Sequence, residues 1–216
     1  MSKDLKKRIY TSILLISLLS LGFINNYIMT YFLIIISLFS IVEFNKIILI
    51  IFKKKKIKQF LFNLAFIIYI FSFCTIFVIF SSFLILKILF FIILTTCIVS
   101  DIGGFVFGKF FKGPKLTKIS PNKTISGSIG SVIFSIIFIL SSIYFLNKNF
   151  DLSIIVVGFI TSLACQIGDL FFSFLKRKSL LKDTGNFLPG HGGILDRIDG
   201  ILLGVPIGFL TLLMIY

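Results

Sequence analysis

Acidic residues are scarce in this 216-residue chain, which has 8 Asp and Glu against 22 Lys and Arg, a single His and no Trp. Hydrophobic residues make up 57% of it, and uncharged apolar runs recur that are long enough to cross a bilayer core of about 30 Å. Apolar residues at every helical angle imply lipid or protein on all sides, which excludes a soluble globular domain. The 29 Phe indicate a genomic base bias rather than a functional code.

Cysteine is also rare. Cys74, Cys97 and Cys165 lie inside apolar stretches, with no CxxC spacing and no neighbouring His, so we expect buried free thiols and neither a disulfide nor a zinc site. The basic start MSKDLKKR and the apolar run after it resemble a signal peptide, but no small-residue cleavage site follows. We therefore expect a retained first helix.

The apolar runs predict an all-α, polytopic integral membrane protein with about seven transmembrane helices in a single membrane domain, residues 1–216. We expect an N-terminal four-helix part in 1–100 and a catalytic part in 101–216. Breaks at charges, Asn pairs and Gly/Pro clusters place the helices near residues 9–24, 27–52, 60–80, 83–100, 129–146, 152–172 and 198–216.

Basic residues predict the orientation of these helices. If the N-terminus is cytoplasmic, the cytoplasmic segments hold KKKKIK and most other Lys and Arg, whereas the opposite turns hold NNY, SS and NKNFD. This positive-inside pattern predicts an N-in, C-out protein of the inner cell membrane, with attraction to anionic membrane lipids. The basic loops lack the interleaved aromatic residues of a stacking platform, so nucleic-acid binding is not expected.

Topology does not explain why aspartates accompany the lysines at two long cytoplasmic loops, around residues 101–128 and 173–197. Asp169 lies near the end of an apolar helix, where a carboxylate is costly without a partner. Asp196 and Asp199 share one helix face if DRID opens the last helix, and they repel each other unless a hard cation such as Mg²⁺ lies between them. An acidic first turn that satisfies the helix dipole is the alternative. Because Asp169, Lys182 and Asp183 add further charged residues to the same region, we favour the metal site over the acidic first turn.

Glycines mark both loops. PGHGG, residues 189–193, can bring the backbone close to a ligand and expose N–H groups to anions. His191 is a candidate general base, or equally a contact to phosphate or metal-bound water. In the other loop, the spacing of Gly104 and Gly108 favours helix packing. The segment KISPNKT, with Lys123 and Thr124, suits a phosphate contact.

SFLKRKSLLKDTGNFLPGHGGILDRID, residues 173–199, closely resembles the signature of the phosphatidate cytidylyltransferase (CDP-diacylglycerol synthase) family. The resemblance extends to CQIGDLFFSFLKR, SDIGGFVFGK and SPNKT, and more loosely to LKKRIYTSILL. It covers most of the C-terminal half and the first helix. We refer to residues 173–199 as the signature segment.

The resemblance implies an enzyme that transfers CMP from CTP to phosphatidate, giving CDP-diacylglycerol and pyrophosphate at the cytoplasmic membrane face. It also implies Mg²⁺, with or without an assisting monovalent cation, and a homodimer. The metal-binding carboxylates would be Asp169, Asp196 and Asp199. The catalytic set would be Asp169, Lys182, Asp183, His191, Asp196, Arg197 and Asp199. The substrate-binding set would be Asp101, Lys123, Thr124, Lys176, Arg177, Gly192 and Gly193, with Lys182 and Arg197 as further phosphate binders.

This chain departs from the family pattern at two positions and is short for the family. Ser126 stands where members carry Glu, and Ile102 stands where they often carry Thr. Two other functions are compatible with charged residues in a membrane protein. A CTP-dependent lipid or polyprenol kinase would transfer the γ-phosphate to an alcohol, and a transporter of a phosphorylated solute would pair charges across repeats in mid-membrane. No repeat is visible here.

Overall fold

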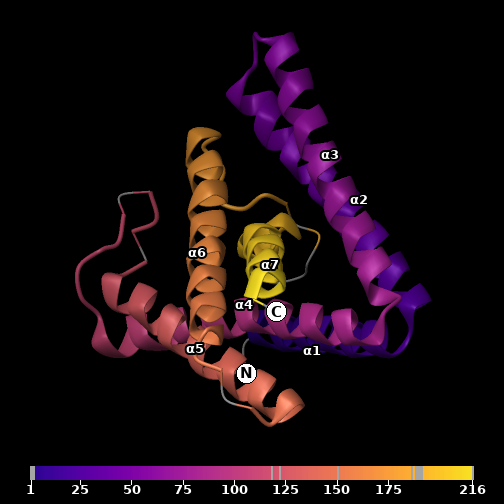
Figure 1. Cartoon of the computed structure of the whole chain (residues 1–216). Coiled ribbons are helices and arrows are strands. Elements are labelled where there is room, and N and C mark those ends of the chain that lie inside the picture. Colours follow the sequence, from indigo (N-terminus) through magenta and orange to yellow (C-terminus); the bar gives the residue numbers. More distant parts are fainter. Residues whose placement is uncertain are drawn as a thin grey trace. The chain divides into compact units, whose positions relative to one another are not determined.

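The structure is a computed structural model that describes residues 3–117, 119–121, 123–149, 151–185, 187 and 192–215, with the side chains of residues 3–9 left out. Within these ranges the fold is entirely helical, apart from one isolated antiparallel bridge between Lys115 and Thr124. The helices are α1 (Lys3–Ile24), α2 (Asn26–Ile51), α3 (Lys56–Ser81), α4 (Leu84–Phe111), α5 (Ile125–Asn147), α6 (Ile154–Lys178) and α7 (Leu195–Ile215) (Figure 1). The all-α prediction is confirmed.

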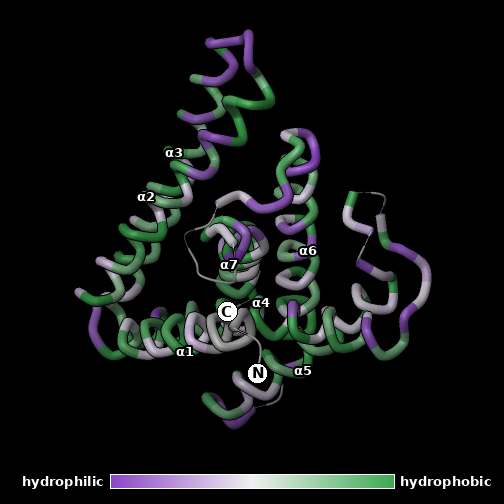
Figure 2. The backbone as a smooth tube through the Cα atoms, turned by 180° about the vertical axis from the view of Figure 1, so that it is seen from behind, coloured by the Kyte–Doolittle hydropathy of each residue, from purple (hydrophilic) through white to green (hydrophobic). Residues whose placement is uncertain are grey.

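Six of the described helices, α2 to α7, are long and apolar enough to cross a membrane, while the apolar part of α1, Tyr10–Ile24, is shorter. Figure 2 shows apolar residues along the helices and hydrophilic ones mainly at their connections. Large apolar side chains such as Phe71, which is 72% exposed, cover the outer faces of the helices. Such surfaces are tolerable in lipid and costly in water, so the polytopic membrane prediction is confirmed.

Several predicted helix boundaries are wrong, because most of the helices are longer than the apolar runs. Helix α4 continues to Phe111, α6 to Lys178, and α7 begins at Leu195. Asp101 therefore lies inside a helix, and the two loops shrink to 112–124 and 179–194. Helix α4 ends where Lys112 and Gly113 both have positive φ, 50° and 110°, before Pro114. Basic residues in the last turn of α6 suit the negative end of its dipole.

The chain packs as two compact units. Unit 1 contains residues 1–84 and 175–198, and unit 2 contains residues 85–174 and 199–216. In unit 1, α2 packs along α3, and the rings of Phe44 and Phe66 stack with centroids 3.9 Å apart. The prediction of a single membrane domain stays a prediction.

In unit 2, small residues allow helices to approach closely. A Cβ added at Gly103 of α4 would lie 2.8 Å from the Gly130 carbonyl oxygen of α5, and one at Gly108 would lie 3.1 Å from Thr124 Oγ1. A Cβ added at Gly104 would lie 2.5 Å from Ser131 Oγ and 3.5 Å from the Gly127 carbonyl oxygen, so the packing role expected of Gly104 and Gly108 is confirmed. A Cβ at Gly204 of α7 would lie 2.7 Å from Cys97 Sγ of α4, and Cys97 is fully buried as a free thiol, as expected.

Candidate active site

The short loop between α4 and α5 folds back on itself and positions Lys123. The Leu116 N–H donates to the Lys123 carbonyl (2.8 Å), and the Lys123 N–H donates to the Ser120 carbonyl (3.1 Å). Immediately afterwards, Thr124 caps α5 by accepting the Gly127 N–H at 3.1 Å. Because this cap and the loop bonds fix the backbone on both sides of Lys123, its side chain is directed by local structure.

Lys123 forms an ion pair with Asp169 of α6, and both side chains remain partly exposed, at 29% and 23%. The pair lines a cavity of about 540 Å³ in unit 2, whose wall also contains Asp101, Lys109 and Thr124. A cavity of a few hundred Å³ is typical of small-molecule sites. The costly carboxylate of Asp169 thus has the partner that its position in an apolar helix requires.

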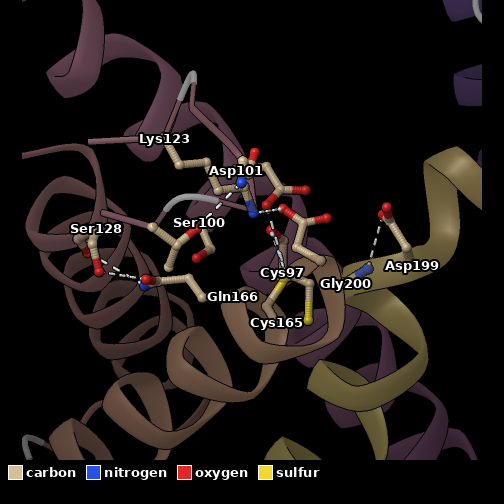
Figure 3. A network of polar contacts seen from close by, with 12 residues as sticks. Cys97, Ser100, Asp101, Lys123, Ser128, Cys165, Gln166, Asp199 and Gly200 are labelled. Carbon is tan, nitrogen blue, oxygen red and sulfur yellow. Dashed lines mark hydrogen bonds and ion pairs between the residues drawn. The ribbon is translucent and has the colours of Figure 1, made fainter. Parts of the chain in front are cut away.

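Ser128 and Gln166, which are hydrogen-bonded to each other, form another part of the cavity wall (Figure 3). The Ser128 hydroxyl donates to Gln166 Oε1, while Gln166 Nε2 donates to the Ser128 carbonyl (3.3 Å) and to Ser162 Oγ (3.2 Å). Ser100 and Ser162 hydroxyls lie 2.9 Å apart behind it. These bonds fix the Gln166 amide in the wall of the cavity that the ion pair also lines.

Glycines bring α6 and α7 together next to Asp169. A Cβ added at Gly168 would lie 2.6 Å from the Asp199 carbonyl oxygen, and one at Gly200 would lie 3.7 Å from Asp169 Oδ1. The carboxylate of Asp169 therefore lies beside the backbone of α7 at the residue after Asp199. Asp199 itself is only 8% exposed, and its Oδ1 accepts the Gly200 N–H at 3.0 Å.

A second cluster lies in unit 1 around Asp196. Its Oδ1 accepts from Lys176 Nζ at 2.6 Å, and its Oδ2 accepts the N–H groups of Thr184 (2.8 Å) and Gly193 (3.1 Å). Gly192 adopts φ 84°, a region that L side chains rarely enter, and this places the Gly193 N–H for its bond. Asp196 is thus both an ion-pair partner and the acceptor that closes the loop before α7.

The other predicted residues have simpler surroundings. Arg177, Lys182, Asp183 and Arg197 are exposed. A Cβ added at Gly192 would lie 3.5 Å from Asp183 Cβ, so Asp183 adjoins this turn. His191 lies outside the described residues, and its predicted role stays a prediction.

Sequence reasoning missed Glu43, which is fully buried in α2 and contacts the signature segment. The argument that singled out Asp169, a carboxylate inside an apolar helix, applies equally to Glu43 and could have found it. It also missed Gln166 and Ser128, which line the cavity. Neither residue is charged, and although Gln166 lies in the segment CQIGDLFFSFLKR that carries the resemblance, only the packing of α5 against α6 shows that it lines the cavity with Ser128.

Asp169 and Asp199 carry carboxylates, the ligand type through which proteins hold Mg²⁺, usually with one or two carboxylates while substrate phosphates and water complete the coordination. Asp169 Oδ2 forms the ion pair with Lys123, and the other carboxylate oxygen, Oδ1, faces the backbone of α7 at Gly200. Among the described residues no group of three acidic, His or Cys side chains is gathered to hold an ion. The predicted metal site that combines Asp196 with Asp169 and Asp199 stays a prediction.

The pattern of the cytidylyltransferase family matches residues 3–215, which is nearly the whole chain and includes both clusters. The chain belongs to the cytidylyltransferase family. The predicted resemblance is confirmed at the level of the family. Both units contribute residues to the match, so the membership does not rest on the signature segment alone.

Similar proteins of this family include two named phosphatidate cytidylyltransferase. The one from Rickettsia felis is 41% identical over 131 residues, 55% of this chain and 56% of that protein. The one from Staphylococcus aureus is 46% identical over 110 residues, 50% of this chain and 42% of that protein. The chain spans about half the length of the curated relatives it matches.

Proposed function

We propose that this protein transfers the cytidylyl group of CTP to phosphatidate, forming CDP-diacylglycerol and releasing pyrophosphate. The observation that carries the proposal is the charged cavity of unit 2, in a chain that belongs to the cytidylyltransferase family. The names of the similar proteins supply the lipid substrate. The assembly we propose is the homodimer that the resemblance implies.

In the proposed reaction, a phosphate oxygen of phosphatidate forms a bond to the α-phosphorus of CTP, and the bond from that phosphorus to the pyrophosphate oxygen breaks. Lys123 and Lys109 bring positive charge to the cavity wall, where they stabilise the negative charge that accumulates on the phosphates. Asp169 holds Lys123 in place before substrate arrives. A magnesium ion held by Asp169 and Asp199 would neutralise part of the polyphosphate charge.

The proposal is tested with the purified chain in vesicles that contain phosphatidate, supplied with CTP labelled in the cytosine. We expect labelled lipid only when phosphatidate and Mg²⁺ are both present. Vesicles of phosphatidylcholine alone serve as the control. Label that enters the vesicle lumen but not the lipid would instead identify a transporter.

We also propose the N-in, C-out orientation, with the active site at the cytoplasmic face of the cell membrane. Asn149, in the turn between α5 and α6, and Lys55, between α2 and α3, are both exposed. Asn149→Cys should react with an impermeant thiol reagent in intact cells, and Lys55→Cys should react only after permeabilisation. The unsubstituted chain gives the background from Cys74, which is half-buried. The reverse labelling pattern would refute the orientation.

Ser126, which stands where the family resemblance implies Glu, is the subject of another prediction. It lies in the first turn of α5, where its hydroxyl donates to the Lys112 carbonyl and is 3.0 Å from Thr124 Oγ1. A carboxylate at a helix N-terminus is favourable, so Ser126→Glu should leave the rate of cytidylyl transfer unchanged or raise it. A loss of more than about tenfold in kcat would show that this loop has adapted to a different arrangement.

A further inference from the structure

Glu43 is a buried acid that the proposed reaction does not use. It lies in α2 about 12 Å before the end of the helix, at 1.5 Å rise per residue, and its side chain is 0% exposed. A carboxylate in such a place is costly unless hydrogen bonds satisfy it. Within the part of the chain that the structure describes, its hydrogen-bond partners belong to one segment, the loop from 179 to 194 and the first residue of α7.

These partners are donors at the start of α7. The Ile194 N–H donates to Glu43 Oε1 (3.1 Å), and the Leu195 N–H donates to Oε2 (2.9 Å). Both belong to the orphan N–H groups that every helix start leaves without intrahelical partners. The negative charge also complements the positive end of the helix dipole. Glu43 therefore serves as an N-terminal cap for α7, supplied from a distant part of the sequence.

Two glycines of the signature segment allow this approach. A Cβ added at Gly193 would lie 2.5 Å from Glu43 Oε2, and one at Gly185 would lie 2.9 Å from Glu43 Cδ. Such distances are shorter than real Cβ contacts, so any larger residue would push the loop off the carboxylate. Glu43 explains the need for glycine at position 185, and Glu43 together with the still closer Thr184 hydroxyl explains it at position 193.

Thr184 connects Glu43 to Asp196. Its hydroxyl, in a residue only 3% exposed, is 2.7 Å from Glu43 Oε2 and 3.0 Å from Asp196 Oδ2. Asp196 also accepts the N–H groups of Thr184 and Gly193, so Glu43 and Asp196 hold the same short piece of backbone from two sides.

The same face of α2 makes two further contacts to the loop. The ring of Phe187 packs against Phe39, with centroids 4.2 Å apart, and Lys46 Nζ lies 5.8 Å from the centre of that ring. Phe39, Glu43 and Lys46 follow the i, i+4, i+7 spacing of one helix face. Helix α2 thus presents a continuous surface to the signature segment, with Glu43 at its centre.

We propose that Glu43 is a positioning residue, which acts through Thr184 and the start of α7 to orient Asp196 for cytidylyl transfer. The inference rests on the proposed function. Its structural basis is the set of bonds that joins a carboxylate of α2 to a loop about 140 residues later in the chain. Asp196 contributes to the reaction only while this loop holds its carboxylate beside Lys176.

The test is a double-mutant cycle between Glu43→Gln and Thr184→Val. The amide has one acceptor oxygen in place of two, so one backbone N–H at the start of α7 must face another donor. Each single variant should lower kcat more than about tenfold while KM for CTP changes less than about threefold. The double variant should be no worse than the more impaired single variant, because both remove one connection. Thr184→Ser, which keeps the hydroxyl, should retain wild-type kcat.

Ser40→Ala is the matched control. Ser40 is buried in the same helix, and among the described residues its hydroxyl bonds only to the Ile36 carbonyl of that helix (2.6 Å), so kcat should not change. A wild-type kcat in Glu43→Gln, or losses that multiply in the double variant, would overturn the inference. If Glu43→Gln fails to insert into the membrane, the comparison of kcat in Thr184→Val and Thr184→Ser decides the question. Equal kcat values in these two variants would overturn the inference.

Hydrogen exchange separates this inference from the proposed function. Glu43→Gln should speed exchange of the Ile194 and Leu195 amides, and Ser40→Ala should not. Absence of labelled lipid with the wild-type chain would refute the function. Unchanged amide protection in Glu43→Gln would refute the positioning role, whatever the activity of the wild-type chain.

Discussion

Asp169→Asn and Asp199→Asn will each reduce cytidine incorporation into lipid by about a thousandfold. CTP brings about four negative charges near neutral pH, and one unit-charge interaction at 4 Å is worth about 4 kcal/mol at an effective dielectric of 20. Carboxylates beside a triphosphate are therefore tenable only with a cation between them, and each Asn removes one unit of the charge that retains this cation. A loss of about 4 kcal/mol corresponds to about three powers of ten in rate.

The double variant should lose little more than either single variant, because groups that hold one ion act as a unit. Asp151→Asn is the matched control. Asp151 lies in the turn before α6, about 15 helical residues or about 22 Å along the helix before Asp169 is reached, and its carboxylate accepts from the N–H (2.9 Å) and hydroxyl (2.6 Å) of Ser153. The amount of membrane-inserted protein should be equal in all variants. Full activity of the double variant, or undiminished turnover in excess EDTA, would contradict the carboxylate–metal assignment.

Lys123→Met will raise KM for CTP at least about tenfold and lower kcat/KM about a hundredfold. The substitution keeps the length of the side chain but removes the ammonium group that pairs with Asp169 in the cavity wall. Without it, the partly buried carboxylate repels incoming phosphate. A charge-assisted contact of this kind contributes about 1.5–3 kcal/mol, which sets the size of the expected loss.

Lys115→Met is the control for Lys123, because Lys115 lies in the same loop and its side chain is exposed. It should leave KM for CTP within about twofold. Lys123→Arg, which keeps the charge, should recover part of the affinity. Equal KM values for wild type and Lys123→Met would show that the cavity is not where the triphosphate binds.

The membrane helices could be predicted from the sequence because apolar runs carry that information directly. The ends of the helices could not be predicted in this way. Helix α4 continues through Asp101 and the glycines that follow, because this part of the helix is stabilised by packing against α5 rather than by an apolar sequence. The same reasoning placed Asp101 at a loop edge. A rule that stops a helix at its first charge fails wherever that charge lines a cavity.

The site was partly predictable for a similar reason. Charged residues in an apolar chain are conspicuous, and the expectation that Asp169 has a partner is confirmed by its ion pair with Lys123. The metal-binding role predicted for Asp169, Asp196 and Asp199 stays a prediction. Glu43 was equally conspicuous but lies in none of the segments that carry the family resemblance. Its partners are mainly backbone N–H groups at the start of α7. Every residue except Pro has such a group, so the sequence does not show which of them will act as a partner.

The central claim is that this chain moves the cytidylyl group, and CTP labelled with tritium in the cytosine and with radioactive phosphorus at the γ-position tests it most directly. After incubation with the purified chain in phosphatidate vesicles, the account predicts tritium in the lipid and the γ-label in released pyrophosphate, in equal molar amounts. A γ-label in the lipid with tritium left in solution would contradict it and identify a CTP-dependent lipid kinase instead.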